Sequence, residues 1–190
     1  MMGGWLAQLL PSGMHGVVFA AEVIRTGVLI ALIVICALCF KLDLGLRAPK
    51  WRRAWPWIAA LLSWDGLVFA VETFHPTEID ERMLEWMKQY TALQLVILVV
   101  LLGPLLEELF CRGALFSSLV HTWGVKVAVI GPSVLWAILH TTYDAWAMFS
   151  IAVAGVLLAL IRWKSGSVYL PWALHAVWNL VVLVAGSFRP

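Results

Sequence analysis

LQLVILVVLLGPLLEELFCRGALFSSLV, residues 93–120, decides the fold, because it is long enough and apolar enough to cross a lipid bilayer. Inside it, GPLLEELFCRG, residues 103–113, carries two adjacent carboxylates and one guanidinium, those of Glu107, Glu108 and Arg112. A charge at the middle of a bilayer costs about 2.5 to 3.5 kcal/mol on the insertion scale, so such residues normally face a protein interior or a watery cavity. The stretch therefore predicts a transmembrane helix with a polar site on one face.

The rest of the chain has a similar composition. Of its 190 residues, 63% are apolar and 13% are charged, and the mean hydropathy is +0.92. A soluble domain is about half apolar and about a quarter charged, so this composition predicts an integral membrane protein. We expect one membrane domain over residues 1–190, with the lipid bilayer as its surroundings. Because the net charge is only +2, we expect no nucleic-acid partner.

Six apolar segments are candidate membrane spans. They run from residue 17 or 24 to 40, and over 54–74, 92–120, 126–142, 145–163 and 168–187. Each should be helical, because a lone strand in lipid leaves its backbone groups without hydrogen bonds. Between the second and third spans, HPTEIDERMLEWMKQY, residues 75–90, is polar and amphipathic, which predicts an interfacial helix. The expected fold is an all-α, polytopic transmembrane helix bundle.

The charges of the loops differ between the two ends of the predicted bundle. Basic residues gather in the first loop and recur in alternate later loops: Lys41, Arg47, Lys50, Arg52, Arg53, Lys126, Arg162 and Lys164. The segment between the second and third spans is instead mainly acidic. By the positive-inside rule the basic end is cytoplasmic and both termini lie outside. We expect a multi-pass protein of the cell membrane, the inner membrane of a bacterium.

Polar residues within the spans have helical spacing. Glu108 and Arg112 are four apart with the acid first, the favourable order for an ion pair along a helix. Glu107 is turned by about 100° from its neighbour, so one carboxylate can be neutralised while the other stays free for chemistry. In later spans, Trp136 and His140 precede a second polar pair four residues apart, His175 and Asn179. Counted from the predicted inner boundary at about 1.5 Å per residue, these polar groups reach similar depths, roughly 16 to 24 Å.

Three motifs in this order resemble those of a known family. EELFCR at 107–112 has the form EExxxR, WAILH at 136–140 stands where the family usually shows FxxxH, and HAVWN at 175–179 has the form HxxxN. The set resembles the CPBP family of intramembrane proteases, which includes the type II CAAX endopeptidases and bacterial relatives linked to bacteriocin processing. The resemblance covers residues 92–187, the expected catalytic core. Tryptophan replaces phenylalanine in the second motif and keeps an aromatic wall.

The resemblance implies a glutamic-type intramembrane endopeptidase. Glu107 would be the general base that activates water with help from His140, while His175 and Asn179 would stabilise the oxyanion. Glu108 and Arg112 would support the site, and no cofactor would be needed. The expected substrate is a hydrophobic, membrane-associated peptide or the C-terminal tail of another protein. Burial raises the pKa of a carboxylate toward neutrality, which suits a base acting on water.

Two alternatives remain open at this stage. The two carboxylates and two histidines could ligate zinc and a bound water, as in metalloproteases, although the histidines lie on separate helices without an HExxH pair. The protein could instead be a non-enzymatic immunity or partner-binding factor of the membrane. Asp65, in the second span, has no partner by sequence spacing and is interpreted as structural.

Overall fold

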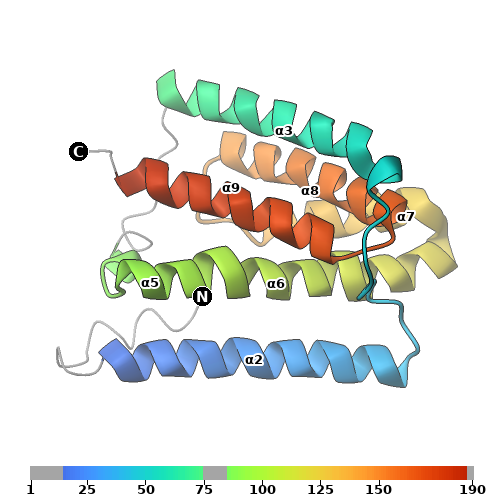
Figure 1. Cartoon of the computed structure of the whole chain (residues 1–190), viewed down its shortest axis with the longest axis horizontal. Coiled ribbons are helices and arrows are strands. Elements are labelled where there is room, and N and C mark those ends of the chain that lie inside the picture. Colours follow the sequence, from blue (N-terminus) through green and yellow to red (C-terminus); the bar gives the residue numbers. More distant parts are fainter. Residues whose placement is uncertain (1–14, 75–84, 188–190) are drawn as a thin grey trace.

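The computed structural model describes residues 15–74 and 85–187, and within these ranges the regular elements are helices (Figure 1). In chain order they are α2 (His15–Cys39), α3 (Trp51–Phe74), α5 (Ala92–Leu95), η2 (Val96–Leu102), α6 (Gly103–Glu108), η3 (Leu109–Leu115), α7 (Phe116–Ile138), α8 (Ala145–Ser165) and α9 (Tyr169–Ser187). The labels η2 and η3 denote π-helical stretches, which continue the helix of α5, α6 and α7.

Five helical stretches in the described part of the chain are long and apolar enough to cross a membrane. The longest, Ala92–Ile138, comprises two spans, because Gly124 has φ 78° and ψ 174° and interrupts the helix. Beyond Gly124 the chain returns along itself, so that Leu119 lies beside Gly131 and Phe116 packs with Ala128. The predicted all-α bundle of about six spans is therefore confirmed.

Several boundaries differ from the sequence prediction. The second span begins at Trp51 rather than 54, and the fourth ends at Ile138 rather than 142, where the chain turns. The interfacial helix predicted over 75–90 falls mostly on 75–84, which lie outside the described residues; residues 85–87 are helical. The third span begins with a capping box, in which Thr91 and Gln94 exchange side-chain and backbone hydrogen bonds.

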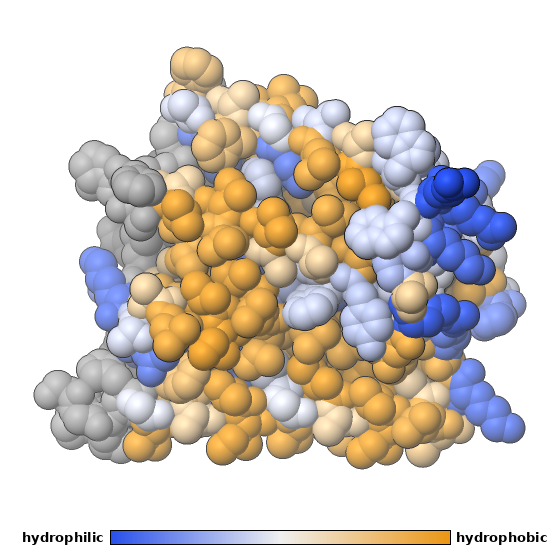
Figure 2. Space-filling view, viewed as in Figure 1, coloured by the Kyte–Doolittle hydropathy of each residue, from blue (hydrophilic) through white to orange (hydrophobic). Residues whose placement is uncertain are grey.

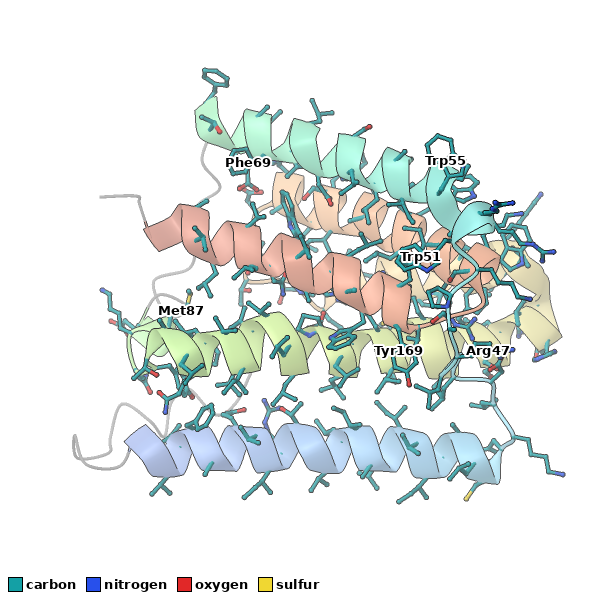
Figure 3. All side chains as sticks on the ribbon, in the orientation of Figure 1. Arg47, Trp51, Trp55, Phe69, Met87 and Tyr169 are labelled. Atoms are coloured by element: carbon teal, nitrogen blue, oxygen red, sulfur yellow. The ribbon has the colours of Figure 1, made fainter. Side chains whose placement is uncertain are left out.

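The helices form a bundle with α2 and α3 on opposite sides and the remaining spans between them (Figure 1). α2 packs on the third span through Ala37 and Leu109. α3 packs on α8 through a core that contains Ala54, Leu61 and Leu158. Apolar side chains cover most of the visible face, and hydrophilic ones gather at the end that carries the loop after α2 (Figure 2). Arg47, Trp51, Trp55 and Tyr169 lie at that end, with Phe69 and Met87 toward the other (Figure 3).

The loop between α2 and α3 is tied to the bundle by Arg162 of α8. Its guanidinium donates to the carbonyl oxygens of Arg112 (3.0 Å) and Asp43 (2.8 Å). Gly45 adopts φ +73°, and a Cβ there would lie 2.5 Å from the Arg162 Cζ, so only glycine fits. Partial burial raises the pKa of Asp43, but the Gly45 N–H, the Arg47 side chain and the charge of Arg162 together hold that pKa below its ordinary value. Arg162 therefore joins the helix that carries Arg112 to the loop between α2 and α3.

Candidate active site

The two adjacent glutamates of α6 face different surroundings. Glu108 is fully buried and pairs with Arg112, also fully buried, at 2.9 Å. Arg112 also donates to the carbonyl of Gly155 on α8 at 3.1 Å. A Cβ at Gly155 would lie 3.2 Å from this guanidinium and 3.0 Å from Ser133, so the close approach depends on glycine. The side chain of Glu107, by contrast, is 35% exposed and takes no part in this ion pair, as their angular separation predicts.

Trp136 links the ion pair to the second carboxylate. Its ring lies under the Arg112 guanidinium, with 4.5 Å between Cζ and the ring centroid. Its indole N–H donates to Glu107 Oε2 at 2.7 Å. A phenylalanine at this position, as in the usual family motif, would keep an aromatic wall but not this hydrogen bond. Tryptophan here therefore fixes one oxygen of Glu107 and leaves the other available.

His140 lies just beyond the end of α7, where the helix tightens. The backbone N–H of His140 bonds to the Ala137 carbonyl, so the carbonyl of Trp136 is free to contact His140 Nδ1 at 2.7 Å. Because a carbonyl can only accept, Nδ1 carries the proton, and in a neutral imidazole Nε2 is then an unprotonated acceptor. The ring also contacts Trp136 edge-on, at 5.3 Å between centroids. His140 thus offers a basic nitrogen beside the wall that holds Glu107.

His175 bridges the two glutamates from α9. Its Nδ1 lies 3.1 Å from Glu108 Oε1, and its Nε2 lies 3.9 Å from Glu107 Oε2, beyond hydrogen-bond distance. Glu108 Oε1 also accepts from Arg112, so this oxygen acts as an acceptor and the Nδ1 of His175 donates to it. The ring is only 7% exposed and packs edge-on against Trp136, with centroids 5.1 Å apart. The carboxylate of Glu108 therefore orients a histidine as well as neutralising an arginine.

Asn179 is held by a backbone carbonyl that the π-helix η2 leaves free. Gly103 donates to the Leu98 carbonyl, five residues back, so the next bond in this pattern would join Pro104 to Val99. Proline has no N–H, and the Val99 carbonyl instead accepts from Asn179 Nδ2 at 2.9 Å. One N–H of the amide remains for another acceptor. Pro104 thus frees a carbonyl by its place at the end of a π-helix.

The structure brings the predicted residues into one cluster, with Trp136 as its centre. Glu107, His140 and His175 each contact Trp136, whereas within the described residues no hydrogen bond or ion pair joins His140 to Glu107. Asn179 lies one turn beyond His175 on α9 and donates to η2. Two further residues lie near the cluster: Asp65, which the sequence led us to interpret as structural, and Tyr143, which the sequence did not single out. Asp65 is near enough for its charge to interact with that of His175, and Tyr143 stacks on His140 at 6.0 Å.

Some donor atoms of the cluster are engaged within the protein. Within residues 15–74 and 85–187, no group of three or more His, Cys, Asp and Glu side chains is arranged to hold a metal ion. Glu108 is taken by Arg112 and His175, and the Nδ1 of His140 by a backbone carbonyl.

A bundle of apolar helices that can cross a membrane, with carboxylate, imidazole and amide groups turned inward, defines the class of membrane proteins that have a polar functional site among their spans. The protein family is more specific than this class. Residues 89–181 match the family described as type II CAAX prenyl endopeptidase Rce1-like, and this part of the chain belongs to that family. The match contains all three motifs, so the chain carries a CAAX-type protease domain. No significant match was found among curated proteins or solved structures.

Proposed function

We propose that the protein is a glutamic-type intramembrane endopeptidase, with Glu107 as the general base and His140 as its partner in activating water. His175 and Asn179 stabilise the oxyanion, while Glu108 and Arg112 support the site. The observation that carries this proposal is the contrast between the two adjacent glutamates. Glu108 is fully buried with its Oε1 shared by Arg112 and His175, whereas Glu107 is partly exposed and fixed by one indole N–H.

The reaction follows from these groups. Glu107 removes a proton from a water molecule that the bare Nε2 of His140 orients, and the water oxygen attacks the carbonyl carbon of the peptide bond. The carbonyl electron pair moves to the oxygen, whose negative charge meets N–H donors from His175 and Asn179. When the tetrahedral intermediate collapses, the C–N bond breaks and Glu107 returns the proton to the leaving amine. The products are a new carboxyl terminus and a free amine.

The contacts of His175 set a condition on its role. Since its Nδ1 proton points to Glu108, an N–H donor at Nε2 requires the doubly protonated, cationic ring. We propose that His175 meets this condition when the oxyanion forms, so that its Nε2–H donates to the oxyanion beside the amide of Asn179.

The substrate proposed is a hydrophobic peptide that reaches the site within the membrane, such as a lipid-modified C-terminal tail. The family name supports prenylated CAAX tails as the first probe. The cluster lies among membrane spans rather than in a soluble domain, so the scissile bond must be brought to bilayer depth. The basic end is proposed to face the cytoplasm, in the inner membrane of a bacterium.

The test is cleavage of a farnesylated CAAX peptide by the purified protein and by Glu107→Gln. This change keeps volume and hydrogen bonding but removes the base, so kcat should fall by at least about 100-fold, while melting in detergent stays near that of the wild type. Glu22→Gln is the matched control, because Glu22 pairs with Arg25 on α2 and should be dispensable for cleavage. An active Glu107→Gln would overturn the assignment of the base.

The zinc alternative is tested on the same preparation. Cleavage should survive thorough chelation, and the protein should contain no stoichiometric zinc. Loss of cleavage on chelation, with recovery on adding zinc, would support the metalloprotease instead. If no peptide is cleaved, and cells are protected equally by a variant lacking the four catalytic candidates, the non-enzymatic alternative is favoured.

A further inference from the structure

Tyr143 lies beside the proposed catalytic groups, although none of the three family motifs contains it. It belongs to the turn between α7 and α8, and its backbone N–H bonds to the His140 carbonyl at 3.1 Å. The two rings are stacked, with 6.0 Å between centroids and an interplanar angle of 29°. The backbone hydrogen bond and the ring contact together fix the phenol beside His140.

The phenol of Tyr143 is also close enough to Glu107, the proposed base, to interact with its charge. Burial raises the pKa of Tyr143, and the negative charges of Glu107 and Glu72 raise it further. The ring is half-buried rather than fully solvated. Tyr143 therefore stays protonated at neutral pH, and its O–H is a donor.

Among the described residues, no hydrogen bond engages this O–H; the groups that act on it do so through burial and charge alone. The phenolic oxygen is not among the fully buried polar atoms that lack a partner, so it is accessible to a bound group. The neighbouring Thr142 hydroxyl is buried and also has no partner within the described residues. The turn thus presents unused polar groups next to His140, where a bound peptide would supply carbonyl acceptors.

We propose that Tyr143 is a substrate-binding residue, whose phenolic O–H donates to a main-chain carbonyl of the peptide next to the scissile bond. This inference rests on the proposed peptidase function and adds a binding contact to it. A main-chain carbonyl is common to every peptide, so the contact sets the register of the chain over Glu107 and His140 rather than selecting a side chain. The same contact exists before and during the reaction, so it should act on binding rather than on the chemical step.

The experiment compares Tyr143→Phe with the wild type on the farnesylated CAAX peptide. Phenylalanine keeps the ring stacked on His140 and removes only the O–H. KM should rise about tenfold with kcat nearly unchanged, the loss expected of one hydrogen bond. Tyr169→Phe is the matched control, because Tyr169 lies at the basic end of the bundle (Figure 3) and should leave KM unchanged.

Binding is measured separately from turnover, in proteins that carry Glu107→Gln. The Kd of the same peptide should rise about tenfold when Tyr143→Phe is added to Glu107→Gln. A second peptide has the adjacent carbonyl replaced by a thioamide, which is a weaker acceptor. It should bind the Glu107→Gln protein less tightly than the ordinary peptide does. The double variant, which lacks the phenolic O–H, should bind the two peptides with nearly equal Kd.

Two results would overturn the inference. The first is a KM equal to that of the wild type, together with a Kd equal to that of Glu107→Gln, after Tyr143→Phe is introduced. This result would exclude the binding contact, while cleavage by the wild type would still support the proposed function. Loss of kcat alone, with a shifted pH profile, would also overturn it, because the O–H would then act on the chemical step through His140 rather than on peptide binding.

Discussion

Replacing the buried ion pair of the third span separates its two proposed tasks. Glu108 Oε1 accepts from Arg112 at 2.9 Å and lies 3.1 Å from the Nδ1 of His175. Glu108→Leu removes the acceptor of both contacts. The buried guanidinium of Arg112 then keeps its hydrogen bond to the Gly155 carbonyl but loses its counter-ion. Arg112→Leu leaves a buried carboxylate with only the histidine beside it.

The size of the effect follows from complete burial. Both side chains are 0% exposed, so water cannot compensate either charge. Breaking a buried pair by removing one partner costs about 3 to 5 kcal/mol in soluble proteins, and each single variant should lose stability of that order. The double variant, with two leucines, leaves no unpaired charge and should recover most of the loss, since apolar replacement of a buried pair is often neutral.

Cleavage should not recover in the same way. The double variant still lacks the acceptor that orients His175, so its kcat should remain low although its stability returns. The assay is apparent melting in detergent at a fixed scan rate, combined with steady-state cleavage of the farnesylated peptide for all four proteins. A double-mutant cycle is calculated once from the melting temperatures and once from the kcat values, and each cycle gives the coupling between Glu108 and Arg112.

Two results would refute this reasoning. If Glu108→Leu melts at the temperature of the wild type, the pair does not stabilise the bundle. If the double variant cleaves as fast as the wild type, Glu108 has no role in orienting His175 and the pair is purely structural.

Three further predictions concern other parts of the molecule. Asn179→Ala should lower kcat by about 100- to 1000-fold, the usual loss of an oxyanion donor, and steady-state cleavage that stays within a few-fold of wild type would exclude that role. Gly45→Ala should lower the melting temperature, because it combines a strained φ of +73° with a clash against Arg162; the strain alone costs about 1 to 3 kcal/mol. Gly27→Ala, with open space around its Cβ position, is the control that should not destabilise. The folded-state pKa of Asp43 lies below the ordinary 3.8, so its carboxylate adds stability above that pH, and this contribution disappears as the pH falls through the lowered pKa. Melting measured from neutral to acidic pH should therefore lose part of its acid dependence in Asp43→Asn, and an unchanged profile would contradict the pairing.

The sequence predicted those features that depend on local spacing. The six spans follow from runs of apolar residues, and the pairing of Glu108 with Arg112 follows from an interval of four on a helix. The reversal at Gly124 falls in the predicted gap between the third and fourth spans. Each of these is decided by neighbours within one or two helical turns, so no knowledge of the packing was needed.

Contacts between distant segments were beyond such reasoning. The indole N–H of Trp136 on Glu107 and the guanidinium of Arg162 on the Arg112 carbonyl join residues 29 and 50 apart. The substitution of Trp for the family's usual Phe was visible in the sequence, but its hydrogen bond depends on how α7 crosses α6. The π-helices were also missed, because VILVVLL has the same apolar pattern in either helical form. Tyr143 gave no signal, since a tyrosine in a turn is common.

The π-helix η2 makes the number of residues between Thr91 and Glu107 a functional quantity. A π-helical turn holds one residue more than an α-helical turn. Removing one residue from Val96–Leu102 would therefore close the π-helical turn and give the Val99 carbonyl a partner other than Asn179, while leaving composition and hydropathy almost unchanged. Substitutions among Val, Ile and Leu in this segment should be tolerated, whereas single insertions and deletions should be strongly disfavoured during evolution.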